Sequence, residues 1–103
     1  MHVVILVTAK DKKEAHKIAN KLVAGKLIAC ANIINGIESV FWWDGKIDNA
    51  KEVLLVLKSR KSLVSKIIKT VKLVHSYSVP EIIALPIIAG NKDYLKWIDG
   101  STG

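Results

Sequence analysis

The sequence predicts an α+β fold with the element order βαββαβ, a ferredoxin-like sandwich with a long central hairpin and a short C-terminal helix. Continuous apolar runs at Val3–Val7 and Val53–Lys58 are typical of strands that are covered on both faces. The first and third strands are central in a ferredoxin-like sheet, and these two runs fall at those places in the order. A chain of 103 residues is expected to form a single domain, 1–103.

The first helix is predicted between Asp11 and Gly25. Asp11, followed three residues later by Glu14, is a capping-box-like start. Apolar residues then recur at helical spacing, at Ala15, Ile18, Ala19, Leu22 and Val23. Gly25 stands where a helix commonly ends in a left-handed residue, so we expect it to take that conformation.

A long hairpin is predicted from about Ile28 to Lys58. Asn35-Gly36 indicates a bend or bulge in its first arm, and Asp44-Gly45 is a strong signal for a tight turn. The arms are longer than the usual strand of about five or six residues. We therefore expect the hairpin to extend beyond the rest of the sheet.

Three aromatic residues surround the predicted turn of this hairpin. Phe41 and Trp43 point to one side of the strand and Trp42 to the other. A projecting ribbon with aromatic residues on both faces indicates a partner surface, so we expect all three at an interface between copies of the chain. The alternative is a tip that folds back onto its own core.

The second helix is predicted from the spacing of Leu63, Val64, Ile67, Ile68 and Val71. Either Ser59 or Ser62 is expected to cap its N-terminus. The fourth strand is expected from Glu81 to Ile88. It contains Pro86, which has no amide donor, so this should be an edge strand.

A last helix is predicted with Asn91 as its N-cap and Gly100 as its end. Half of the residues are hydrophobic, which argues against disorder. No apolar run approaches the roughly 20 residues of a membrane span, and no signal peptide is evident, so no membrane partner is expected. The single cysteine, Cys30, excludes an intrachain disulfide and favours a reducing, cytoplasmic location.

The net charge of +7 could attract nucleic acid, or could reflect a lysine-rich solvated surface. The basic residues between Glu52 and Glu81 are Lys58, Arg60, Lys61, Lys66, Lys69 and Lys72. The predicted central strands carry no aromatic residue, so the stacking platform of an RNA recognition motif is absent. Nucleic-acid binding would therefore be weak and electrostatic, without specificity.

Five stretches follow one another along the chain at a characteristic spacing: LIACANI at Leu27–Ile33, SVFWWDGKI at Ser39–Ile47, EVLLVLKS at Glu52–Ser59, HSYSVPEIIALPI at His75–Ile87 and YLKWI at Tyr94–Ile98. Together they resemble the divalent-cation tolerance (CutA) family over nearly the whole chain. The resemblance implies a tight homotrimer, similar in architecture to the trimeric PII signalling proteins. It also implies no established enzymatic activity, and a link to tolerance of divalent metals, chiefly copper.

The chain departs from the family where metal binding would be expected. The family usually has His-Pro-Tyr-Glu where this chain has His75-Ser76-Tyr77-Ser78. The positions of proposed copper ligands in some relatives correspond to Val7 and Val74, which supply no donor atoms. We therefore expect binding of Cu(II), or of another divalent cation, to be weaker here than in relatives with a full ligand set.

Three residues remain as candidate metal ligands: His75, Cys30 and Glu81. No cation is expected to be required for folding. The alternative for His75 is a hydrogen bond at the end of the second helix, and the alternative for Cys30 is a buried packing thiol. No catalytic residue is predicted, because nothing local activates Cys30 and there is no phosphate-binding glycine loop.

The sequence thus predicts a non-enzymatic cytoplasmic homotrimer connected with divalent-metal tolerance. One alternative is a PII-like signalling protein that binds a small anionic ligand in clefts between subunits, with Lys58 and Tyr77 in the cleft. The other is the weak electrostatic nucleic-acid binder.

Overall fold

Four strands form one antiparallel sheet in the order β2-β3-β1-β4 in the computed structural model, which describes residues 1–103. The elements are β1 (His2–Ala9), α1 (Lys12–Ala24), β2 (Cys30–Trp43), β3 (Lys46–Arg60), the 3-10 helix η1 (Lys61–Leu63), α2 (Val64–Val74), β4 (Ile82–Pro86) and α3 (Lys92–Ser101). The central strands are β1 and β3, as their apolar runs predicted. The ferredoxin-like arrangement is confirmed.

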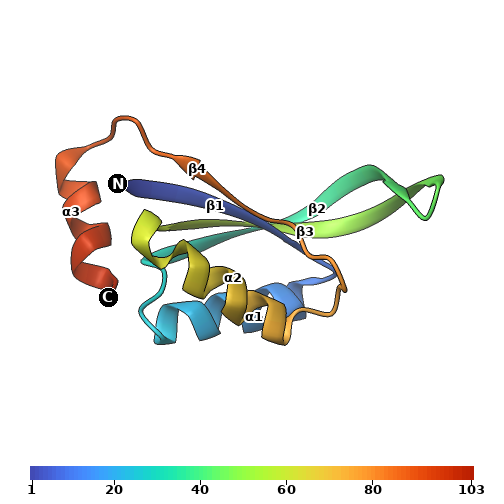
Figure 1. The fold of residues 1–103 in the computed structure, drawn as a ribbon, viewed down its shortest axis with the longest axis horizontal. Helices are drawn as coiled ribbons and strands as arrows, with labels where there is room; N and C mark the ends of the chain where they lie inside the picture. The colour runs from blue at the N-terminus through green and yellow to red at the C-terminus, as the bar shows by residue number, and fades with distance from the viewer.

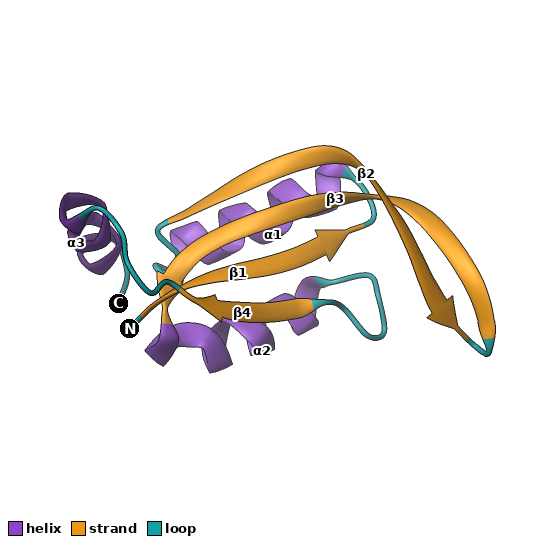
Figure 2. Ribbon diagram, turned by 90° about the horizontal axis from the view of Figure 1, so that it is seen from above, coloured by secondary structure: helices purple, strands orange, loops and turns teal.

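Helices α1 and α2 lie side by side on one face of the sheet, and the opposite face carries no helix (Figure 1). Figure 2 shows this open face, with α3 beyond the end of the sheet where both termini lie. The β2–β3 hairpin projects from the other end, in a molecule that measures 44 × 25 × 23 Å. None of the helices is long and apolar enough to cross a bilayer.

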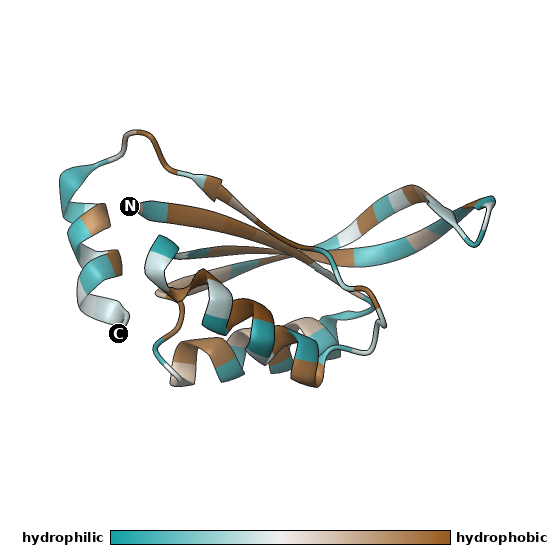
Figure 3. Ribbon diagram, in the orientation of Figure 1, coloured by the Kyte–Doolittle hydropathy of each residue, from teal (hydrophilic) through white to brown (hydrophobic).

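The core lies between the sheet and the two helices. Its largest fully buried side chains include Ile5, Leu55 and Leu57 from the sheet and Ile18 and Ile67 from the helices. The residues that alternate with them on β1 and β3 face the open side and are half-buried: Val4, Leu6, Leu54 and Val56. Figure 3 shows that hydrophobic residues run continuously along β1. The apolar runs predicted that β1 and β3 are covered on both faces. Within a single chain, helices cover only one face of these strands.

The end of α1 differs from the prediction. Gly25 has a φ of −80°, and the left-handed residue is Lys26, with a φ of 57°. The amide of Lys26 donates to the Val23 carbonyl and that of Leu27 to the Leu22 carbonyl, each at 3.0 Å. This bonding pattern is a Schellman motif, in which the residue after the C-cap takes the left-handed conformation. Lys26 occupies that place because the helix reaches one residue further than predicted.

The predicted serine caps of α2 are also wrong. The N-cap of α2 is Leu63, which makes no side-chain capping bond, and η1 leads into the helix instead. The side chain of Ser59 is buried, and its hydroxyl donates to the Leu27 carbonyl at 2.6 Å. Ser62 is exposed.

The fourth strand is shorter than predicted at both ends. Its last pair is Val3 with Pro86. Because β1 begins at His2, only one further residue of β1 is available to pair with β4. At the other end the next partner of Glu81 would be Thr8, whose carbonyl already accepts a bond from His75. The edge position of β4 is confirmed.

In α3, Asn91 is the N-cap as predicted, and its side chain accepts a bond from the Asp93 amide at 2.9 Å. The helix continues to Ser101, so Gly100 lies inside its last turn and does not end it.

Both irregularities predicted for the hairpin are present. The pairing register shifts between Ile34 and Ile37, where Gly36 has a φ of 77°. Asp44 and Gly45 have φ angles of 54° and 76°, as a two-residue turn of type I′ requires. The tip does not fold back onto the core, and Trp42 is 73% exposed.

Candidate functional site

His75, the first residue after α2, has a fully buried side chain. Its Nδ1 accepts a bond from the Tyr77 amide at 3.0 Å, so the ring proton is on Nε2, which donates to the Thr8 carbonyl at 2.7 Å. Both ring nitrogens therefore have partners within the chain. A metal ion could bind His75 only by replacing one of these hydrogen bonds.

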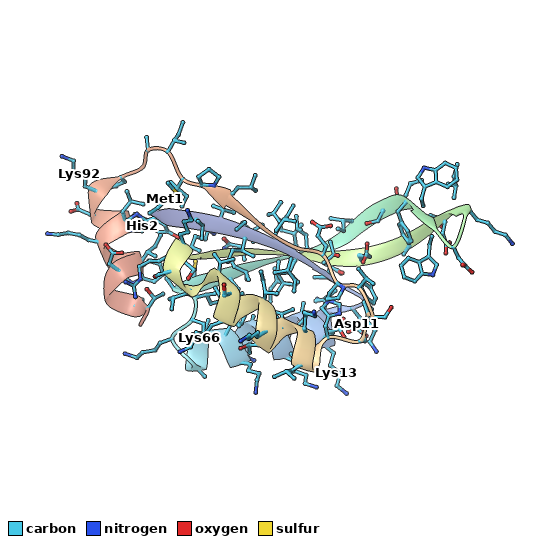
Figure 4. The ribbon with its side chains drawn as sticks, in the orientation of Figure 1. Met1, His2, Asp11, Lys13, Lys66 and Lys92 are labelled. Carbon is cyan, nitrogen blue, oxygen red and sulfur yellow. The ribbon has the colours of Figure 1, made fainter.

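Glu14 joins the start of α1 to the loop that follows α2. Its carboxylate accepts from the Lys10 amide at 3.1 Å and from the Ser76 amide at 2.9 Å, and its own amide donates to Asp11 Oδ1 at 2.8 Å. Figure 4 labels Asp11 beside that loop. Burial by itself would raise the pKa of Glu14, but the hydrogen bonds from Ser76 and Lys10 and the nearby His75 together hold the pKa below its ordinary value.

Tyr77 connects the same loop to β3. Its hydroxyl donates to Glu52 Oε2 at 2.7 Å, and its ring lies against His75 with the ring centroids 4.7 Å apart. Burial raises the pKa of Tyr77 far above its ordinary value, and the hydrogen bond and charge of Glu52 raise it further. The phenol therefore stays protonated and acts as a donor to the buried carboxylate.

These residues adjoin a cavity of about 790 Å³ at the base of the hairpin, which we call the hairpin-base cavity. Four carboxylates line it, from Glu38, Asp48, Glu52 and Glu81. Its aromatic walls come from Phe41, Trp43 and Tyr77. No lysine, arginine or histidine lines it.

The three candidate metal ligands do not form a set of ligands within one chain. His75 is buried at the end of α2, and Glu81 lines the hairpin-base cavity. Cys30 begins β2 and is half-buried, with its Sγ 3.6 Å from the Tyr94 hydroxyl. No three His, Cys, Asp or Glu residues of the chain are arranged to hold a metal ion. The donor atoms of one chain alone therefore do not make a metal site.

The two candidate cleft residues are also apart within one chain. Tyr77 meets β3 at Glu52, whereas Lys58 lies further along β3 and pairs with Cys30 on β2. The Lys58 ammonium donates to Asn32 Oδ1. A cleft that contains both residues would have to be formed between chains.

The basic region after β3 is mostly solvent-exposed. Lys61, Lys66, Lys69 and Lys72 are exposed on η1 and α2. Figure 4 shows Lys66 and Lys13 on the outer side of the helical layer. Arg60 instead bonds Thr102, with Nε 2.9 Å from its hydroxyl. Binding of nucleic acid by these lysines stays a prediction.

Two carboxylates with partners at this site, Glu14 and Glu52, are not singled out by the sequence patterns. Glu14 was interpreted only as part of a helix cap, and Glu52 was only one letter of a family stretch. A signal was available for Glu52, because a carboxylate next to a continuous apolar run has to find a buried partner. Its partner Tyr77 lies 25 residues away, which the local pattern does not show.

These features define a ferredoxin-like α+β protein. Its sheet has one open face, its hairpin projects from the sheet, and polar residues gather at the base of that hairpin. A sequence model of the family described as "CutA1 divalent ion tolerance protein" matches residues 3–101. The chain belongs to this family, and the resemblance seen in its sequence is confirmed. The family is described by tolerance of divalent ions, not by a reaction.

Individual relatives of the chain carry the name of the same family. The chain is 46% identical over 100 residues to "Protein CutA 1, chloroplastic" of Oryza sativa, a match that covers 97% of this chain and 56% of the rice protein. It therefore spans about half the length of that relative. It is 41% identical over 103 residues to the "Divalent-cation tolerance protein CutA" of Thermus thermophilus, and the match covers 100% of both proteins.

Solved structures show the same fold. The divalent cation tolerance protein of Thermus thermophilus superposes with a TM-score of 0.98 over 100% of both chains. The "Periplasmic divalent cation tolerance protein CutA" of Archaeoglobus fulgidus superposes with a TM-score of 0.95 at 44% identity, covering 98% of each chain.

Proposed function

We propose that this chain is a non-enzymatic protein of divalent-metal tolerance that acts as a homotrimer in the cytoplasm, with copper as its principal cation. The observation that supports the proposal most strongly is the 41% identity, over the full length of both chains, to a protein named for divalent-cation tolerance. The chain's single cysteine favours the reducing location.

The open face of the sheet supports self-association. Val4, Leu6, Leu54 and Val56 lie on this face without a helix over them. The hairpin tip adds Phe41, Trp42 and Trp43, all exposed. Contiguous exposed apolar surface usually marks a partner surface, and a second copy of the same chain offers matching apolar surface. Phe41, Trp42 and Trp43 accordingly form part of the interface between protomers.

The metal would then be held between protomers, because one chain does not gather three donor groups. Imidazole and thiolate donors suit Cu(II) and Cu(I), and carboxylates suit harder cations. Cys30, with its half-buried sulfur, and Glu81, which is exposed, are the candidates whose donor atoms can be reached. His75 would contribute only after giving up a hydrogen bond.

Sedimentation equilibrium on the wild-type chain and on Trp42→Glu tests the assembly. The expected mass for the wild type is three times the 11.3 kDa of one chain, and Trp42→Glu should shift it toward one chain. A wild-type mass of 11.3 kDa at micromolar concentration would contradict the trimer.

Calorimetric titration of Cu(II), Zn(II) and Mn(II) into the same samples tests the metal. Saturable binding by the assembled protein, reduced in the dissociated variant, is expected. Absence of binding by an assembled wild-type protein would leave the trimer in place and overturn the metal assignment.

A further inference from the structure

The positive charge of the chain is concentrated on its helical layer, which consists of α1, η1 and α2. The lysines of this layer are all exposed: Lys12, Lys13, Lys17, Lys21, Lys61, Lys66, Lys69 and Lys72. The only carboxylate in the layer is Glu14, which is buried. Eight of the 16 basic residues and one of the nine acidic residues therefore belong to the layer, which leaves eight of each for the rest of the chain. The net charge of +7 is thus the charge of the helical layer.

The lysines of this layer have no anionic partner within the chain. Neither of the two ion pairs in the structure contains a lysine. The two carboxylate oxygens of Glu14 accept bonds from backbone amides. Asp11, directly before α1, is exposed, and its side chain accepts a bond from the Glu14 amide. The ammonium groups of the layer are therefore free to contact an anion from outside the chain.

Lysines recur along each helix at intervals that place them on one face. Lys13, Lys17 and Lys21 follow one another four residues apart on α1, and Lys66 and Lys69 lie three residues apart on α2. Residues at these spacings are neighbours on a helix, so their like charges repel each other. No exposed carboxylate within either helix offsets this repulsion. An anionic surface that contacted both helices would offset it.

The outer side of the helical layer stays accessible when copies of the chain associate. Helices α1 and α2 cover one face of the sheet, whereas the proposed interface uses the other face and the hairpin tip. Lys13 on α1 and Lys66 on α2 both lie on the outer side of the layer (Figure 4). The basic side chains of the two helices thus share one side of the molecule, away from the interface.

Two features favour a membrane over a nucleic acid as the anionic surface. Leu73 on α2 is 83% exposed and lies four residues after Lys69, so an apolar side chain stands among the lysines. At an anionic bilayer, lysines contact the headgroups while apolar side chains enter the boundary between headgroups and acyl chains. The helical layer also contains no arginine, tryptophan, tyrosine or phenylalanine. It therefore lacks the side chains that grip phosphates in pairs of hydrogen bonds and that stack on bases.

We propose that the outer side of the helical layer binds the surface of a bilayer that contains anionic lipids. The lysines contact the anionic headgroups, and Leu73 enters between them. Polybasic segments are attracted to an anionic leaflet in this way. The expectation of no membrane partner rests on the absence of a membrane span, which surface binding does not require. This binding is separate from metal tolerance and needs neither a metal ion nor a second copy of the chain.

The test is co-sedimentation of the full chain with lipid vesicles at neutral pH. Vesicles made of phosphatidylcholine and phosphatidylserine in equal amounts are compared with vesicles of phosphatidylcholine alone. We expect the chain to sediment with the first kind only, and to be released as salt is raised, because exposed charges are screened. A DNA duplex at the same concentration of negative charge should leave most of the chain on the anionic vesicles.

Matched variants locate the surface. Lys69→Gln should weaken vesicle binding about fivefold, from the loss of one charge near the lipid, whereas Lys92→Gln, the same change on α3, should not. Leu73→Gln should also weaken binding, whereas Ile88→Gln, at an exposed position after β4, should not. The mass in solution and the melting temperature of each variant are measured on the same sample, so a change in assembly or folding is recognised separately.

Four results would overturn the proposal. The first is equal sedimentation, or none, with the two kinds of vesicle. The second is equal weakening in Lys69→Gln and Lys92→Gln, which would indicate attraction by net charge alone. The third is wild-type binding by Leu73→Gln, which would remove the reason to prefer a membrane. The fourth is release of most of the chain by the DNA duplex, which would identify a nucleic-acid surface. The trimer and copper binding are measured without lipid, so these results do not bear on them.

Discussion

Tyr77 donates its hydroxyl to Glu52 at 2.7 Å at the point where β3 leaves the hairpin and enters the core. Val53 is the first residue of β3 that pairs with β1, and Glu52 directly precedes it. The bond thus fixes the loop before β4 against the base of the hairpin. The projecting ribbon is held to the body of the protein by a buried hydrogen bond as well as by its backbone ladder.

Removal of this bond should destabilise the protein. Tyr77→Phe leaves Glu52 Oε2 buried without its donor, so the free energy of unfolding should fall by about 1–3 kcal/mol. Urea denaturation followed by tryptophan fluorescence measures the change. Tyr94→Phe is the control, because the Tyr94 ring is more exposed and its hydroxyl has only a 3.6 Å contact with Cys30 Sγ. Equal losses in the two variants would contradict the role assigned to Glu52.

Glu14 should make stability depend on pH in the acid range. Its pKa in the folded state is below the ordinary value of 4.5, so its contribution to stability is complete above pH 4.5 and is lost as pH falls through the folded pKa. Glu14→Gln cannot accept both amide bonds in the same way, and should cost about 1–3 kcal/mol at pH 7. The difference in the free energy of unfolding between Glu14→Gln and the wild type should become smaller below pH 4.5.

Denaturation midpoints measured from pH 3 to pH 7 test this expectation. Glu38→Gln is the control, since Glu38 is exposed and makes no hydrogen bond, and its profile should run parallel to that of the wild type. If the denaturation midpoints of Glu14→Gln and the wild type differed by the same amount at every pH, the charge of the carboxylate would not be what stabilises the loop.

Lys26 offers a site for stabilisation. It has a φ of 57°, a conformation that is unfavourable for residues with a Cβ and that glycine adopts freely. Lys26→Gly should therefore raise the free energy of unfolding by up to about 1 kcal/mol, reduced by the greater freedom of glycine in the unfolded chain. Lys21→Gly makes the same chemical change inside α1 and should lower it by about 1 kcal/mol. A destabilised Lys26→Gly would mean that the side chain contributes more than its backbone strain costs.

The sheet could be predicted from the sequence because its signals are local. Two continuous apolar runs indicated the central strands, Asp44-Gly45 indicated the turn, and Pro86 indicated the edge. Each depends on the conformational preferences of one or two residues, or on an uninterrupted pattern. The open face could not be read from the same runs, because an apolar run does not show which of its two faces a helix covers.

The site could be predicted only in part, because its contacts join residues that are far apart in the chain. His75 and Thr8 are separated by 67 residues, and Ser59 bonds a carbonyl 32 residues away instead of capping the helix beside it. Side-chain hydroxyls and imidazoles bond whichever group the fold brings near, so neighbouring residues do not identify the partner. The metal role of His75 and of Cys30 stays a prediction for the same reason.

His75→Ala separates the structural role of this residue from a metal-binding role. The substitution leaves the Thr8 carbonyl and the Tyr77 amide without their buried partner. Unpaired buried groups cost about 1–3 kcal/mol each, so the variant should melt at a clearly lower temperature. Cu(II) affinity should be unchanged, because both ring nitrogens of His75 are already engaged in the wild type.

His16→Ala is the matched control for this experiment, since His16 is exposed on α1 and its loss should leave the melting temperature unchanged. Melting curves and Cu(II) titrations at neutral pH are compared for the wild type and both variants. If His75→Ala abolished copper binding but melted like the wild type, His75 would be a ligand. The two hydrogen bonds of its ring would then have to open when the metal binds, which would make copper affinity depend on the mobility of the loop that follows α2.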